Sequence, residues 1–143
     1  MRKIITKTPE ETFGLAKKIG QKLAQGCTIA LDGDLGAGKT VFVQGLAAGI
    51  GIEKPILSPT FNIVRQYSGR LPFNHFDVYR IESSDELCEI GFFEYLRDGQ
   101  VTVIEWAEKI AETLPKDTVY VHISGAGDEP REITLTGEER LEI

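Results

Sequence analysis

Eight consecutive residues, Gly33–Thr40, have the composition and spacing of a loop that binds phosphate groups. They match the pattern G-x-x-x-x-G-K-[ST] at every fixed position. Glycine lets the backbone turn tightly and approach a ligand, so the N–H groups of such a loop point at a polyphosphate. Lys39 would reach the β- and γ-phosphates, and Thr40 would offer its hydroxyl to Mg²⁺. The residues predicted to bind the nucleotide here are Gly33, Asp34, Leu35, Gly36, Ala37, Gly38, Lys39 and Thr40.

Two acidic residues are candidates for the rest of a nucleotide site, which needs an acid for Mg²⁺ at the end of a buried strand. Glu105 follows the strand-forming run Val101–Ile104 directly; the alternative is a surface acid that starts a helix. Asp77 ends a less apolar run, and it either binds metal through water or positions the attacking water; the alternative is a solvated acid at a strand edge. The catalytic candidates are Lys39, Asp77 and Glu105, with Thr40 and Glu105 as metal ligands.

Four further residues have a functional and a structural interpretation. Ser58 and Thr60 lie where a switch segment senses the γ-phosphate, although a Pro-containing connection is the simpler interpretation. His75 shares a strand face with Asp77, and a hydrogen-bonded structural histidine is favoured over a catalytic one. Trp106 either stacks on a base or partner or packs in the core.

The segments around the loop have the patterns that a phosphate loop requires. The apolar run Cys27–Leu31 predicts a buried strand before it, and residues 41–49 predict a helix after it. Upstream, residues 3–7 predict a strand. Thr8 is the predicted N-cap of the next helix, with Glu11 completing a capping box and Gly26 ending that helix.

Downstream, residues 61–67 and 73–79 predict two strands, and their short connection implies an antiparallel hairpin. A second capping box at Ser83–Glu86 predicts a short helix. The fold class predicted is α/β: a single P-loop NTPase-like domain over residues 1–143, with a mixed parallel and antiparallel sheet flanked by helices. The other expected elements are an apolar helical turn at 92–96, strands at 101–105, 118–123 and 132–135, and a helix at 107–114.

Composition narrows the possible functions. The formal net charge of -6 argues against free-standing nucleic-acid binding, which needs a basic face. Two cysteines form no disulfide framework and lack the spacing of metal ligands. The sequence shows no signal peptide and no apolar run long enough to span a membrane, so we expect a cytoplasmic protein without a membrane partner.

Four motifs taken in order resemble one family. Gly33–Thr40 is followed by S-P-T-F at 58–61, H-F-D-V-Y-R at 75–80 and I-E-W-A-E at 104–108, and this combination is similar to the TsaE family, also called YjeE. Its members are small bacterial ATPases needed to make threonylcarbamoyladenosine in tRNA. The resemblance covers nearly the whole chain. It implies ATP and Mg²⁺ as cofactors and TsaB and TsaD as partners, with hydrolysis resetting the TsaB–TsaD complex between turnovers.

The resemblance also implies roles for individual residues. Lys39 would bind the phosphates, Asp77 would be needed for hydrolysis, and Thr60 would lie in a switch-like segment. Trp106 would be a further functional position beside the site. The residues that would border the base pocket, by analogy, are Thr8, Glu108 and the turn Gly125–Asp128.

The sequence shows no obvious arginine finger, because Arg65 and Arg80 are equally well explained as surface charges of the hairpin. We therefore expect slow hydrolysis alone and faster hydrolysis with partners, since a supplied positive charge is worth ~10³–10⁵ in rate. One competing interpretation is a small-molecule kinase, but a kinase lid is usually basic and the segment 82–89 is acidic. Another is a nucleotide-dependent binding module that barely hydrolyses ATP. The presence of Thr40, Asp77 and Glu105 together argues against it.

Overall fold

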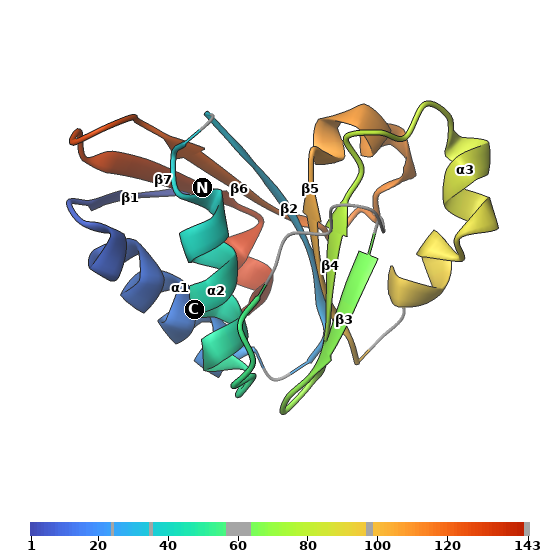
Figure 1. The fold of residues 1–143 in the computed structure, drawn as a ribbon, viewed down its shortest axis with the longest axis horizontal. Coiled ribbons are helices and arrows are strands. Elements are labelled where there is room, and N and C mark those ends of the chain that lie inside the picture. The colour runs from blue at the N-terminus through green and yellow to red at the C-terminus, as the bar shows by residue number, and fades with distance from the viewer. Residues whose placement is uncertain (24, 35, 57–63, 97–98, 142–143) are drawn as a thin grey trace.

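A seven-stranded mixed sheet forms the centre of the computed structural model, which describes residues 1–23, 25–34, 36–56, 64–96 and 99–141 (Figure 1). The strand order is β1-β7-β6-β2-β5-β4-β3. The inner strands β6, β2, β5 and β4 are parallel, while β1–β7, β7–β6 and β4–β3 are antiparallel pairs. The strands are β1 (Arg2–Thr6), β2 (Cys27–Gly33), β3 (Val64–Ser68), β4 (Pro72–Asp77), β5 (Val101–Glu105), β6 (Val119–Ser124) and β7 (Arg131–Thr136).

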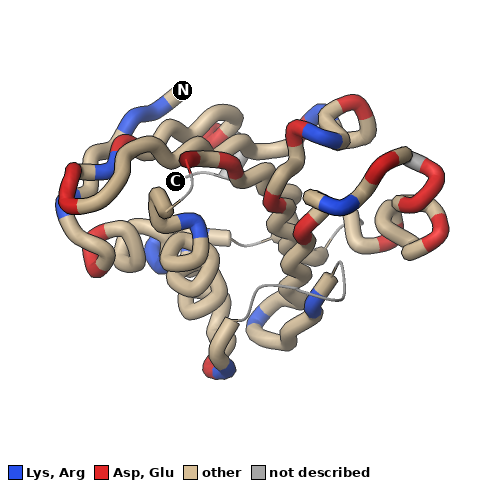
Figure 2. Tube along the Cα trace, turned by 45° about the horizontal axis from the view of Figure 1, so that its top comes forward, with Lys and Arg blue, Asp and Glu red and all other residues tan. Residues whose placement is uncertain are grey.

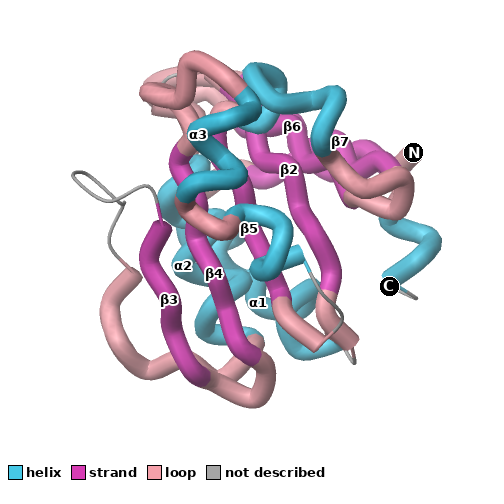
Figure 3. Tube along the Cα trace, turned by 90° about the vertical axis from the view of Figure 1, so that its right-hand side faces the viewer, coloured by secondary structure: helices cyan, strands magenta, loops and turns pink. Residues whose placement is uncertain are grey.

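Helices cover both faces of this sheet. Figure 3 shows α1 (Pro9–Lys22) and α2 (Lys39–Gly49) behind the strands and α3 (Ser84–Glu89) in front of them. Three 3₁₀ helices complete the fold: η1 (Phe92–Leu96), η2 (Ala107–Thr113) and η3 (Glu138–Leu141). The predicted fold class, a single α/β domain with a mixed sheet flanked by helices, is confirmed.

The core divides into two apolar clusters, one on each side of the sheet. Ile29 and Leu31 of β2 pack in the cluster under α1 and α2. Ala30, between them, packs in the second cluster with Phe76 and Phe92. Successive side chains of a strand point to opposite faces, so a continuous apolar run is what a strand buried on both faces requires. This burial fixes the strand that leads into the phosphate loop.

The predicted start of α1 is confirmed, and its predicted end is wrong. The backbone N–H of Glu11 donates to the Thr8 hydroxyl at 3.1 Å. The Glu11 carboxylate accepts from the N–H of Lys7 at 2.7 Å, one residue before the expected partner. The helix ends at Lys22 rather than at Gly26. A Cβ at Gly26 would lie 2.3 Å from backbone atoms of Gln100, so this glycine allows close packing of the chain before β2.

The hairpin and the short helices follow the prediction with shifted details. Strands β3 and β4 are antiparallel, with Val64 opposite Phe76; residues 61–63 of the predicted strand lie outside the described residues. At α3, the described residues show no capping bond from the Ser83 side chain. Instead, the Glu86 carboxylate accepts from the N–H of Glu82 at 3.0 Å. Residues 92–96 and 107–113 are 3₁₀ rather than α-helical. None of the helices in the described ranges has the length and hydropathy needed to span a bilayer.

Candidate nucleotide-binding site

The start of α2 is arranged to meet an anion. Gly38 is its N-cap with a left-handed backbone (φ 102°), and the structure shows no side chain among the described residues capping this end. The first turn carries no acidic residue. The N–H groups at a helix start have no partner within the helix, and the helix dipole adds positive potential there. This end of α2 therefore favours a phosphate group.

The loop needs glycine at its three glycine positions for different structural reasons. Gly36 and Gly38 have φ values of 78° and 102°, and a Cβ at either would meet no atom within 4 Å. Their backbone conformation requires glycine, while the space beside them is open. A Cβ at Gly33 would lie 2.3 Å from the carbonyl oxygen of Ile123. Gly33 thus lets β2 approach β6, so the expectation that all the loop glycines serve the ligand is incomplete.

Lys39 lies at the loop, in contact with both its backbone and an aromatic ring. Its Nζ donates to the carbonyl oxygen of Gly33 at 3.4 Å and lies 5.0 Å from the ring centroid of Trp106. Trp106 has a positive φ of 64°, which is uncommon for a residue other than glycine. Its half-buried ring also packs against Tyr79, with centroids 4.7 Å apart. Trp106 is therefore a neighbour of the phosphate loop as well as part of the second apolar cluster.

The two candidate acids lie side by side. Asp77 and Glu105 are register partners at the ends of the parallel strands β4 and β5, and Glu105 is also the register partner of Leu31 in β2. The carboxyl ends of parallel strands meet at one edge of a sheet, where α/β proteins place their ligands. Both acids therefore lie at the edge of the sheet from which the phosphate loop leaves β2 (Figure 1). Of the two alternatives for Glu105, the structure excludes a surface acid, because its exposed fraction is 8%.

Each acid has a defined hydrogen bond. Nε2 of His75 lies 2.6 Å from Oε2 of Glu105, and both side chains are buried. Oδ1 of Asp77 accepts from the backbone N–H of Tyr79 at 2.9 Å, which closes a turn directly after β4. The structure therefore couples His75, expected to be a structural histidine, to the predicted metal-binding acid.

The donor set fits Mg²⁺ carried with a nucleotide. Mg²⁺ prefers oxygen ligands and is usually held by one or two protein groups together with substrate phosphates and water. Thr40, exposed on the first turn of α2, offers a hydroxyl, and the neighbouring strand end offers the carboxylate of Glu105. Within the described residues, no group of three or more His, Cys, Asp and Glu could hold a metal ion by itself. This arrangement fits a metal that arrives with its phosphates better than a metal cage made of protein alone.

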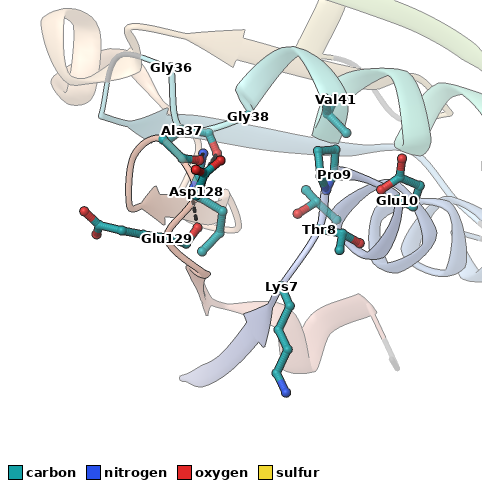
Figure 4. Close-up of a pocket in the computed structure, with 13 residues that line it drawn as sticks. Lys7, Thr8, Pro9, Glu10, Gly36, Ala37, Gly38, Val41, Asp128 and Glu129 are labelled. Atoms are coloured by element: carbon teal, nitrogen blue, oxygen red, sulfur yellow. Dashed lines mark hydrogen bonds between the residues drawn. The ribbon is translucent and has the colours of Figure 1, made fainter.

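A pocket of about 400 Å³ lies on the other side of the loop. Figure 4 shows Thr8 and Pro9, at the start of α1, across the pocket from the loop and from Asp128 and Glu129. Its size lies within the ~300–1,000 Å³ common for small-molecule sites. Thr8 and part of the late turn thus share one pocket, and that this pocket receives the base stays a prediction. Glu108 is exposed and lines a different pocket with Ile81, Glu82 and Ser83; Leu35, Ser58 and Thr60 lie outside the described residues.

Arg131 holds this pocket together, and the sequence analysis did not single it out. Its Nε donates to the carbonyl oxygen of Ala37 at 3.0 Å, and its terminal nitrogens donate to the carbonyls of Gly127, at 3.0 Å, and Glu129. One guanidinium thereby joins the phosphate loop to the turn before β7. Since 94 residues separate Arg131 from Ala37, no local pattern could have revealed the contact.

Comparison with known proteins identifies the family. The family model described as threonylcarbamoyl adenosine biosynthesis protein TsaE matches residues 6–133. The chain belongs to the TsaE family. It is 46% identical over 132 residues to the tRNA threonylcarbamoyladenosine biosynthesis protein TsaE of Bacillus subtilis, covering 92% of this chain and 82% of that protein. It is 40% identical over 131 residues to the protein of the same name from Treponema pallidum, covering 92% of this chain and 97% of that protein.

A solved structure agrees with this assignment. The crystal structure of Bacillus subtilis YdiB is similar with a TM-score of 0.73 and 39% sequence identity, covering 99% of this chain and 88% of that chain. The resemblance to the TsaE family inferred from the four motifs is thus confirmed. The roles of the individual site residues stay predictions.

Proposed function

We propose that this TsaE-family protein is an Mg²⁺-dependent ATPase that serves tRNA threonylcarbamoyladenosine modification by acting on the TsaB–TsaD complex. The observation that carries the proposal is one sheet edge, where the phosphate loop leaves β2 and Glu105 ends the neighbouring strand β5. Curated relatives named as tRNA threonylcarbamoyladenosine biosynthesis proteins support the pathway.

In this proposal the chain supplies charge and positioning. Lys39 exchanges the carbonyl of Gly33 for the phosphates, where the N–H groups at the start of α2 also donate. Thr40 and Glu105 would hold Mg²⁺, and the bound ion would supply the charge that polarises the phosphoryl oxygens. Asp77, beside Glu105, orients the attacking water. Thr8 and the turn that contains Asp128 enclose the base and ribose in the pocket described above.

The positions of two arginines, Arg131 and Arg80, support slow hydrolysis by the isolated protein. Arg131 lies against the loop but uses Nε and both terminal nitrogens on backbone carbonyls, so it is committed to holding the pocket. Arg80 is exposed beyond the end of β4. A positive charge from a partner would raise the rate, as arginine fingers do by ~10³–10⁵. Hydrolysis would then depend on binding to the TsaB–TsaD complex, and hydrolysis would reset that complex between turnovers.

The charge distribution fits a protein partner better than RNA. Figure 2 shows Asp and Glu gathered along the lobe that carries α3, including Asp85 and Glu86. An acidic surface repels the nucleic-acid backbone, so the tRNA would be reached through the partners rather than bound directly. The same acidic lobe disfavours a kinase, whose lid must close over phosphates. A role in tRNA modification supports a cytoplasmic location for the protein.

The test is ATP hydrolysis by the protein alone and then with TsaB and TsaD. We expect a low rate that rises with the partners. Lys39→Ala should lower it by about 10–100-fold or more, because the lost charge-assisted contact is worth ~1.5–3 kcal/mol in binding alone. A fast isolated enzyme would contradict the need for a partner. Normal hydrolysis by Lys39→Ala would refute the loop assignment, and partners that neither bind nor alter the rate would refute the pathway.

A further inference from the structure

His75 and Glu105 form a buried pair at the edge of the sheet where the site lies. The exposed fractions are 2% for His75 and 8% for Glu105, and Nε2 lies 2.6 Å from Oε2. The two residues sit on neighbouring parallel strands with an offset of two positions, since Glu105 is the register partner of Asp77. Residues two apart on a strand share a face, so His75, Asp77 and Glu105 all point to the same side of the sheet.

The pair is costly as a purely structural feature. Burying a carboxylate beside an imidazole requires removing both from water, and well-packed apolar residues of similar volume often serve stability equally well. Nδ1 of His75 is also buried and has no hydrogen-bond partner within the described part of the chain. An unpaired buried polar atom destabilises the folded state. The bond from Nε2 to Glu105 is therefore the side-chain hydrogen bond that the described residues show for His75.

The direction of the bond follows from the proposed role of Glu105. A carboxylate that binds a metal is ionised and only accepts hydrogen bonds, so in that role Nε2 of His75 donates to Oε2. This contact restricts the orientation of the Glu105 carboxylate through one of its two oxygens, Oε2. Carboxylates that bind metals are commonly held in this way, and losing the outer partner typically costs about 10–100-fold in metal affinity or activity.

We propose that His75 is a positioning residue, which holds the carboxylate of Glu105 in the orientation that receives the Mg²⁺ of the bound nucleotide. The proposal rests on the proposed function, because it assumes an Mg²⁺–nucleotide complex at this edge. It assigns to His75 an effect on the Mg²⁺ requirement rather than on nucleotide contacts. The two effects can be separated, since the Lys39 contact and the α2 start do not need the metal to meet a phosphate.

The experiment measures binding of fluorescently labelled ADP in EDTA and across an Mg²⁺ titration. His75→Met fills the space without donating, and His75→Gln places an amide N–H at nearly the reach of Nε2. We expect His75→Met to raise the Mg²⁺ concentration for half-maximal effect about 10–100-fold and to leave the affinity in EDTA unchanged. His75→Gln should stay within about threefold of the unmodified protein, because its N–H replaces the lost donor.

A double-mutant cycle separates positioning from a structural role. If His75 acts through Glu105, His75→Met should have no further effect on the Mg²⁺ requirement in a Glu105→Ala background. An unchanged Mg²⁺ requirement in His75→Met overturns the proposal, and so does an equal loss of affinity with and without Mg²⁺. If thermal unfolding shows that His75→Met does not fold, His75→Asn replaces it, because its shorter amide cannot reach Oε2 while Gln can; equal behaviour of Asn and Gln then overturns the proposal.

Binding of ADP by the unmodified protein distinguishes a failure of this proposal from a failure of the proposed function. If the protein binds ADP and Lys39→Ala does not, the nucleotide site stands whatever His75→Met shows. If the unmodified protein fails to bind ADP at all, the proposed function fails and takes the positioning role with it.

Discussion

The two sides of the phosphate loop are built in different ways. On one side, the acid side, His75, Asp77 and Glu105 are carried by the adjoining strands β4 and β5 in a fixed register. On the other, the pocket side, Thr8 and the turn 127–129 come from chain segments outside the sheet and are joined to the loop by Arg131. The acid side is largely buried, whereas Thr8 and the turn are exposed.

In the proposed function, this difference separates the groups that would act on the phosphates from the groups that would recognise the base. Groups that act on a phosphoryl oxygen must be held within a fraction of an ångström, and strands buried on both faces supply that rigidity. A pocket for the base can be made of loops, which tolerate adjustment. Substitutions on the acid side should therefore change the rate or the metal requirement. Substitutions on the pocket side should change which ligands bind.

The largest effect is expected for Glu105→Gln on the acid side. Loss of the charge that holds Mg²⁺ removes several kcal/mol of transition-state stabilisation, so hydrolysis should fall by about 10² or more. ADP affinity in EDTA should be unchanged, because the loop and Lys39 remain. Steady-state hydrolysis in the presence of the partners measures the effect, and Glu112→Gln, an exposed acid on η2, is the matched control. A rate within threefold would remove Glu105 from the mechanism.

The next prediction compares the stability effect of a substitution between two strands with that of a substitution in the loop. In Gly33→Ala the new Cβ would lie 2.3 Å from the carbonyl oxygen of Ile123, so β2 and β6 must move apart. Overpacking of this kind costs about 1–3 kcal/mol in the free energy of unfolding. Gly36→Ala meets no atom within 4 Å and places Ala at φ 78°, a left-handed strain of about 1–2 kcal/mol. Urea denaturation should rank Gly33→Ala as the less stable; the reverse order would contradict the packing role.

On the pocket side, Arg131→Ala should lower ATP affinity by about tenfold. The variant releases the turn from the carbonyl of Ala37, and hydrogen bonds from a charged donor are worth about 1.5–3 kcal/mol each before the ligand compensates. Inorganic tripolyphosphate, which has no base or ribose, should bind with unchanged affinity. Competition against fluorescent ADP measures both ligands, with Lys22→Ala at the far end of α1 as control. An equal loss for both ligands would show that Arg131 supports the phosphate loop instead.

A final effect concerns the first residue of β2. Burial, with a smaller contribution from the negative charge of Asp117, raises the pKa of the Cys27 thiol from 9.0 to about 12. The folded state therefore holds a proton that the unfolded state releases above pH 9.0, so stability is retained below that pH and falls as pH rises towards 12. The loss is at most about 1.4 kcal/mol per pH unit.

Urea denaturation between pH 8 and 10.5, compared with Cys27→Ala, measures this slope. At neutral pH a thiol reagent should label the exposed Cys88 faster than the half-buried Cys27 in the folded protein. Labelling of Cys27 in the folded protein as fast as in the unfolded protein would show that the start of β2 opens, which would weaken the contrast between a rigid acid side and an adjustable pocket side.

Much of the fold was predictable because its signals are local. A buried strand is a run of apolar residues, and β5 (Val101–Glu105) was predicted with its bounds unchanged. The start of α1 was predictable because Thr8, Pro9 and Glu11 act within a single turn. Helix ends and short helices were less predictable. Packing decided them, since Gly26 serves a contact with Gln100 instead of ending α1.

The sequence by itself determined the match of residues 33–40 to a phosphate-loop pattern, the two candidate acids and the resemblance to the TsaE family. These depend on residue types at fixed short spacings, which carry their chemistry wherever the chain places them. Only the tertiary structure decided that His75 contacts Glu105, that Arg131 contacts Ala37, and that Gly33 serves the packing of β2 on β6. These contacts join residues that are 30 to 94 positions apart, so they arise from strand order and register, which no local pattern encodes.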